Sequence, residues 1–111
     1  MTFDVRYYVT DSGRDVFLDW ITGVRDVVAK SAVSRRVNRL RNGHFGDHAC
    51  CRDGVWELRI DVGPGYRVYY ARTGRDILLL LNGGDKQSQP GDIARACEYL
   101  RNEKRRLNDA K

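Results

Sequence analysis

The sequence lacks the features of a membrane protein and of a secreted, disulfide-bonded domain. No segment approaches the roughly 18 consecutive apolar residues of a membrane-spanning helix. The opening stretch MTFDVRYYVT has no basic start followed by an apolar signal core. Cysteine is scarce, and Cys50, Cys51 and Cys97 form no CxxC pair. That spacing argues against a disulfide framework and a zinc site, so we expect a protein of the reducing cytoplasm.

Internal repeats, low-complexity tracts and linkers are absent as well, and acidic residues are fewer than basic ones. The 111 residues suffice for a single domain, residues 1–111, and 41% hydrophobic with 32% charged residues is typical of a globular chain. The formal net charge is +5. A positive surface field attracts polyanions, so RNA, DNA and an acidic protein are all candidate partners.

Apolar spacing predicts the order of the secondary-structure elements. Residues 42–54 are rich in Gly and Asp and predict a loop. The predicted elements are a strand over 3–10, a helix capped by Asp11 or Ser12 and ended by Gly23, a helix over 24–41, strands over 55–62, 66–72 and 77–81, and a helix that Asp92 caps and that ends near Asn108.

Alternation within the strand 55–62 places Trp56 and Leu58 on one side and Glu57 and Arg59 on the other. We interpret the first side as core and the second as solvent-facing. The order of strand, two helices, three antiparallel strands and helix predicts an α+β sandwich. Its helices are expected to pack on one face of the antiparallel sheet and to leave a partly open basic face.

Charged residues gather on that open face. Glu57, Arg59 and Arg67 share it because residues two apart point the same way and paired strands lie about 4.8 Å apart. Lys86 follows the last strand and approaches from the edge. Three cations around one carboxylate can bind a phosphate group. The same charges can equally form cross-strand ion pairs, each worth less than about 1 kcal/mol, and the pattern alone leaves both interpretations open.

Several segments resemble the RelE/ParE/HigB superfamily of toxins, most closely the HigB-like branch of addiction module killer proteins. They are GVWELRI, GPGYRVYY and LLLLNGGDKQSQPGDIARA, and FLDW, RVNRLRNGHFGD and the closing helix are similar too, so the resemblance covers nearly the whole chain. It implies a RelE-like fold and the toxin of a bacterial type II toxin–antitoxin system. Such toxins are typically ribosome-dependent mRNA endonucleases without a cofactor.

The resemblance also implies partners and site residues. A helix-turn-helix antitoxin encoded by a neighbouring gene would neutralise the toxin, and operator DNA would be bound only through that complex. In this family the functional cations lie on the central strands and just beyond the last one. By position these are Arg59, Arg67 and Lys86.

The implied chemistry is attack of the RNA 2′-hydroxyl on the adjacent phosphorus, which gives a 2′,3′-cyclic phosphate and a 5′-hydroxyl without requiring a metal. Arginine forks suit the phosphoryl oxygens, whose negative charge grows in the transition state. Members of the RelE branch have a lysine where Glu57 aligns, whereas glutamate is usual among killer proteins. We take Glu57 as the hypothetical base.

Four further residues are candidates for RNA contacts. Tyr69 can stack on a base or donate its hydroxyl, or it can be a packing aromatic. Arg39 lies on a basic helix side that can track phosphates or be merely solvated. Killer-protein relatives often have a lysine shortly after FGD, where this chain has His48 and Ala49; His48 or Arg52 is expected to replace it.

Two other functions stay open on the sequence. A ParE-like poison of DNA gyrase shares the fold and cleaves nothing, but that branch lacks the cation set of Arg59, Arg67 and Lys86. A non-toxic co-repressor that only binds its antitoxin is the second. The cations favour the endonuclease.

Overall fold

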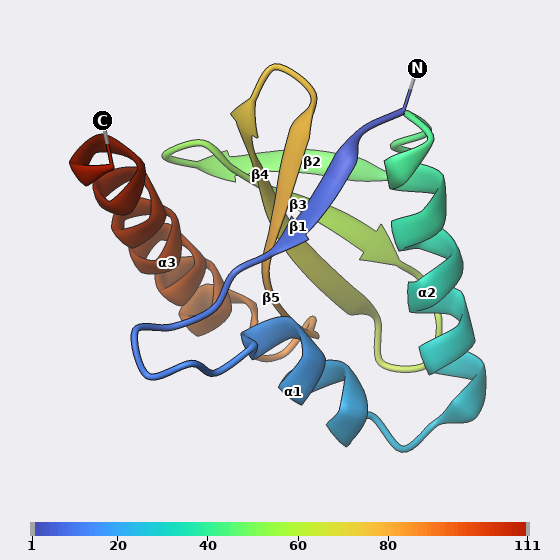
Figure 1. The fold of residues 1–111 in the computed structure, drawn as a ribbon. Helices are drawn as coiled ribbons and strands as arrows, with labels where there is room; N and C mark the ends of the chain where they lie inside the picture. Colours follow the sequence, from blue (N-terminus) through green and yellow to red (C-terminus); the bar gives the residue numbers. More distant parts are fainter. Residues whose placement is uncertain (1, 111) are drawn as a thin grey trace.

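The computed structural model describes residues 2–110, in which a five-stranded sheet carries helices on both faces (Figure 1). The strands are ordered β1-β5-β4-β3-β2, and only the β1–β5 pair is parallel. In chain order the elements are β1 (Asp4–Tyr7), α1 (Val16–Gly23), α2 (Val27–Arg41), β2 (His48–Arg52), β3 (Val55–Ile60), β4 (Tyr66–Gly74), β5 (Ile77–Asp85) and α3 (Gln89–Asp109). The predicted α+β class and element order are confirmed, with β2 as an addition.

The prediction of a loop over residues 42–54 is wrong, because β2 lies within it. β2 pairs antiparallel with β3, and Ala49 lies opposite Glu57. Asp53 and Gly54 connect the two strands with φ angles of 54° and 85°. An Asp-Gly pair with two positive φ angles fits the twist of a hairpin. The Gly and Asp residues occupy only the ends of the segment, and the five residues between them form the strand.

The predicted cap of the first helix is wrong, and the second helix, for which no cap was predicted, has a similar one. Asp15, rather than Asp11 or Ser12, caps α1, and its carboxylate accepts a hydrogen bond from the backbone N–H of Leu18 at 3.0 Å. Asp26 caps α2 in the same way. In each case the cap directly precedes the first helical residue, as the geometry of N-capping requires.

The last helix begins earlier than predicted. Ser88 occupies the N-cap position of α3 and Pro90 lies in its first turn, where proline's fixed φ and missing N–H are tolerated. Asp92 therefore lies inside the helix instead of capping it. Its buried side chain contacts Ser88 Oγ at 2.5 Å.

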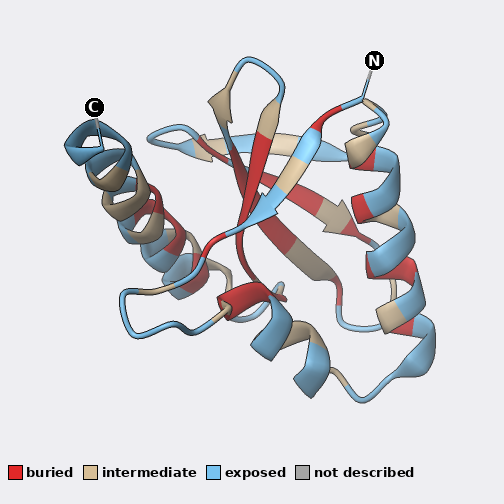
Figure 2. Ribbon diagram, in the orientation of Figure 1, coloured by how far each residue is buried: buried red, intermediate tan, exposed pale blue. Residues whose placement is uncertain are grey.

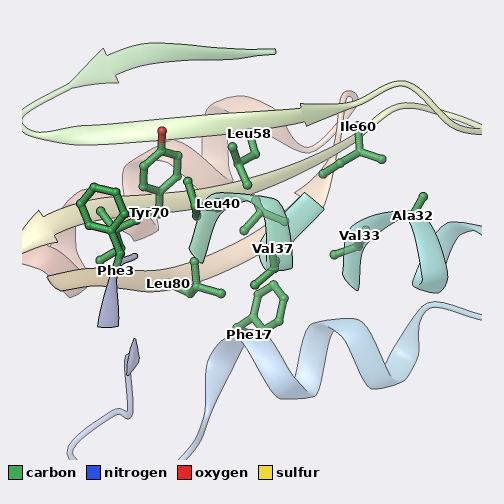
Figure 3. Close-up of a cluster of buried hydrophobic side chains, with 12 residues drawn as sticks. Phe3, Phe17, Ala32, Val33, Val37, Leu40, Leu58, Ile60, Tyr70 and Leu80 are labelled. Carbon is green, nitrogen blue, oxygen red and sulfur yellow. The ribbon is translucent and has the colours of Figure 1, made fainter. Parts of the chain in front are cut away.

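The two faces of the sheet each have a core, so the prediction that helices cover one face only is wrong. Figure 1 shows α2 and α3 on opposite sides of the strands, and in Figure 2 the buried residues concentrate between the helices and the strands. The first face packs under α1 and α2 (Figure 3), with Phe17, Val33, Val37, Leu40, Leu58, Val68 and Leu80 among its members. The second packs under α3, with Val55, Tyr69, Ala71, Leu79, Leu81, Ala96 and Leu100.

The sequences of β4 and β5 explain why both faces of the sheet are covered and not one. Apolar residues occupy both alternating sets of positions there, so both faces exclude water. Only the strand 55–62 gave a clear polar side in the sequence. Among residues 2–110, no helix combines the length and the apolar composition that crossing a bilayer requires.

Candidate functional site

The buried carboxylate of Glu57 lies at the centre of the candidate site. β3 and β4 place Glu57 opposite Tyr69 and Arg59 opposite Arg67, so Glu57 and both arginines share the second face, as predicted. Glu57 is 4% exposed. Its Oε2 lies 2.8 Å from Arg67 Nε and 3.6 Å from Arg59 Nε. A charge this buried requires such partners.

Two residues that the sequence did not single out complete the environment of Glu57. Gln89, the first residue of α3, donates from Nε2 to both carboxylate oxygens, at 3.0 and 3.2 Å. The thiol of Cys51 lies 3.5 Å from Oε1. The sequence does not say which face of the sheet α3 covers, and the Gln89 contact depends on that choice.

The Cys51 thiol gives a prediction about chemical reactivity. Burial, followed by the nearby Glu57 charge, raises the pKa of Cys51 to about 12. At pH 8 only about one thiol in ten thousand is then a thiolate, the nucleophilic form. Cys50, by contrast, is exposed. We expect iodoacetamide at pH 8 to label Cys50 well before Cys51, as read by peptide mass spectrometry; equal labelling rates would contradict this environment.

The two arginines that contact the carboxylate differ in exposure. The side chain of Arg59 is 41% exposed and that of Arg67 is 14% exposed. Arg67 uses Nε for the ion pair with Glu57, while its Nη1 donates to the carbonyl of Tyr66 at 3.3 Å. Each guanidinium carries five N–H donors, so both arginines keep donors for an incoming anion.

Lys86 completes the rim next to Arg67. Its backbone N–H donates to the carbonyl of Gly65 at 2.8 Å. A Cβ on Gly65 would lie 3.7 Å from both Arg67 Nη1 and Lys86 Cβ, so both residues border the turn between β3 and β4. Gly65 has a φ of +82°, a conformation that glycine adopts without strain. The exposed Lys86 thus adds a third positive charge.

Arg36 of α2 holds the backbone that carries Arg59. Its guanidinium donates to the carbonyl of Arg59 at 2.5 Å, to that of Phe45 at 2.9 Å and to that of Asp47 at 3.1 Å. These bonds join the helix, the loop before β2 and the end of β3. The sequence showed Arg36 only as one of several arginines on a basic helix.

The proposed stacking role of Tyr69 is wrong. Tyr69 is fully buried beneath α3, and its hydroxyl oxygen is buried as well. Burial raises the pKa of this phenol above its ordinary value. Its ring is one of the largest side chains in the second-face core, so packing is its role in the structure. Tyr69 shares its face of the sheet with Arg67. Because α3 covers that face, Tyr69 is buried.

Of the other three residues predicted to contact RNA, one lies beside Glu57 and two lie on the first face. Arg52 lines a pocket of about 310 Å³ together with Glu57, Cys51, Pro90 and Ile93, and so belongs to the site. His48 pairs with Leu58, and its ring lies 5.5 Å from that of Trp56, on the first face. Arg39 is an exposed residue of α2, which packs on the first face too. Neither His48 nor Arg39 joins the Glu57 cluster.

The fold and the site together define an α+β protein with two arginines paired to one buried carboxylate. Over 80 residues the chain is 42% identical to a protein of Haemophilus influenzae that is named only as an uncharacterized protein; the match covers 72% of this chain and 81% of that protein. The chain belongs to the same family as this Haemophilus protein. No protein-family model matches the sequence.

Proposed function

We propose that the chain is the toxin of a bacterial type II toxin–antitoxin system, from the HigB-like addiction module killer branch of the RelE/ParE superfamily. It would act in the cytoplasm as a ribosome-dependent mRNA endonuclease and so inhibit translation. The observation that carries the proposal is the pairing of Glu57 with Arg59 and Arg67, with the exposed Lys86 beside the adjoining turn at Gly65. Cleavage by a 2′-hydroxyl requires a base, donors that stabilise the transition state and a cation at the leaving group.

The proposed step begins with a ribose beside Glu57, which lines the pocket of about 310 Å³. Glu57 takes the 2′-hydroxyl proton, and the 2′-oxygen forms a bond to the adjacent phosphorus. Arg67 keeps its Nε on Glu57 while its other donors, with those of Arg59, stabilise the phosphoryl oxygens. The bond from phosphorus to the 5′-oxygen breaks, and Lys86 supplies the proton of the new 5′-hydroxyl. The other product is a 2′,3′-cyclic phosphate.

Gln89 supports the base in this scheme. Because its amide spans both oxygens of Glu57, it holds the carboxylate plane in one orientation. A general base has to be within hydrogen-bond reach of the proton that it removes. A carboxylate held in one orientation would keep that reach to a ribose bound beside it.

Replacing Glu57 by glutamine tests the base directly. Glu57→Gln keeps the shape of the side chain and removes the proton acceptor, so we expect cleavage to fall by about 10²–10⁴-fold. The measurement is single-turnover cleavage of mRNA on programmed ribosomes. Asp61→Asn, at an exposed carboxylate just beyond β3, is the control and should retain the wild-type rate. Full activity of Glu57→Gln would remove Glu57 from the role.

Brief induction in a bacterium tests the proposed function as a whole. We expect growth to stop and new 5′-hydroxyl ends to accumulate in translated messages while plasmid supercoiling is unchanged. Co-expression of the helix-turn-helix protein from the neighbouring gene should restore growth. Intact messages with altered supercoiling would favour a gyrase poison instead, and normal growth would favour a co-repressor.

A further inference from the structure

A second concave surface lies on the face of the sheet opposite Glu57. Trp56 directly precedes Glu57 in β3, so the two side chains project from opposite faces of the strand. We call the surface around Trp56 the aromatic pocket. It has a volume of about 210 Å³ and is lined by Phe45, His48, Trp56, Tyr70, Arg72 and Leu78. Figure 3 shows Tyr70 at the end of the first-face core, beside Phe3.

The aromatic rings of the pocket form a continuous row that opens to solvent. Centroid distances are 5.5 Å from Trp56 to His48, 5.4 Å from His48 to Phe45 and 6.3 Å from Phe45 to Tyr70. Trp56 is 37% exposed, although a tryptophan that serves only packing is usually well buried. Part of a large flat ring is therefore free to contact a ligand.

The charge around the pocket is positive. None of its six lining residues is acidic, and Arg72 lies at its edge, with its guanidinium 5.4 Å from the ring centre of Phe3. The Nδ1 atom of His48 lies 2.9 Å from the carbonyl of Gly46. Because a carbonyl only accepts, this Nδ1 carries the proton, and Nε2 is left to accept a hydrogen bond.

We propose that the aromatic pocket binds one nucleobase of single-stranded RNA, with Arg72 beside the neighbouring phosphate. Aromatic faces stack on unpaired bases of any sequence, and an arginine at the rim adds attraction to the backbone. Bases inside a duplex have no free face for this contact. The net charge of +5 and the absence of acidic lining residues favour a polyanion. The choice of RNA rests on the proposed function.

The position of the pocket explains how one RNA strand reaches both sites. β2 forms the edge of the sheet next to β3. An RNA strand that passes around this edge can place a phosphate at Arg59 and Arg67 and a more distant base against Trp56. The pocket then holds substrate without touching the reacting atoms. Its loss should weaken RNA binding and leave the cleavage step of bound RNA unchanged.

The chain has two tryptophans, so Trp20→Phe leaves Trp56 as the sole tryptophan, and emission excited selectively from tryptophan then reports on the pocket. We expect a single-stranded 2′-O-methyl oligonucleotide, which cannot be cleaved, to quench this emission saturably. Trp56→Leu should weaken binding of the same labelled oligonucleotide by about 5- to 150-fold, and Arg72→Ala should weaken it in the same direction. Tyr7→Ala removes an aromatic residue of similar exposure, 40%, outside the pocket and should have no effect.

Other outcomes overturn the inference. Quenching by duplex RNA alone, unchanged affinity in Trp56→Leu, or no binding of the oligonucleotide excludes a base site. Emission that responds only to the antitoxin makes the pocket a protein-docking surface. If Trp20→Phe does not fold, the difference in emission between wild type and Trp56→Phe replaces it. Saturable quenching without ribosomal cleavage would support the base site and refute the endonuclease. Ribosomal cleavage without saturable quenching would refute only the base site.

Discussion

Arg67→Ala will lower the rate of RNA cleavage by about 10²–10³-fold, the usual loss when one preorganised transition-state donor is removed from a buried site. Arg67 is mostly buried, and its Nε lies 2.8 Å from the Glu57 carboxylate. Its removal therefore affects both the phosphoryl oxygens and the base. The measurement is single-turnover cleavage of ribosome-bound mRNA, in which a loss in the chemical step is separated from a loss in binding.

Two further variants sharpen this prediction. Arg67→Lys keeps the charge but not the planar fork, so we expect it to recover less than a tenth of the activity. Arg35→Ala removes an exposed arginine of α2 and serves as the matched control for net charge. Thermal unfolding has to be measured alongside, because Arg67→Ala leaves Glu57 with fewer partners. Wild-type cleavage by a folded Arg67→Ala protein would refute the proposed site.

Gly84→Ala is expected to cause a large loss of stability. A Cβ at this position would lie 1.9 Å from Asp92 Oδ2, 2.8 Å from Asp92 Cγ and 2.7 Å from Ser88 Oγ. Asp92 cannot easily yield, because Arg95 contacts its Oδ1 at 2.6 Å and Asn82 donates to its backbone carbonyl at 3.0 Å. The first turn of α3 therefore has to move away from β5.

Such overpacking costs about 1–3 kcal/mol, and each kcal/mol lowers the Tm by about 4–8 °C in a domain close to this size. Gln89 lies in the displaced turn, so cleavage should fall as well. The measurements are thermal unfolding and single-turnover cleavage. Gly23→Ala is the control: apart from the neighbouring residues and the backbone of α1, none of the described residues has an atom within 4 Å of the added Cβ, and its Tm should change by little. Equal Tm values for Gly84→Ala and wild type would contradict the packing of α3.

The central part of the site was predictable from the sequence. Alternation along the strand 55–62 places Glu57 and Arg59 on one side, and the short connection after it forces the next strand to pair beside it. The structure confirms this, since Arg59 lies directly opposite Arg67. These relations depend only on the two-residue period of a strand and on a tight turn, which are local properties.

The contacts that close the site depended on tertiary packing. The apolar stripe of the last helix tells which side of that helix is buried but not which face of the sheet receives it. In the structure α3 covers the second face, which buries Tyr69 and brings Gln89 to Glu57. The same packing covers most of the expected open face and leaves the Arg59 side chain partly exposed and Lys86 exposed.

The 2′-hydroxyl mechanism is tested most directly with a single chemical change in the RNA. Purified protein is added to ribosomes that carry a defined message, and the fragments are mapped and their ends identified. We expect fragments with 2′,3′-cyclic phosphate and 5′-hydroxyl ends, and no cut when the nucleotide before the cleaved bond is 2′-deoxy. Cleavage that persists at the 2′-deoxy position, or fragments with 5′-phosphate ends, would contradict the roles assigned to Glu57 and the three cations.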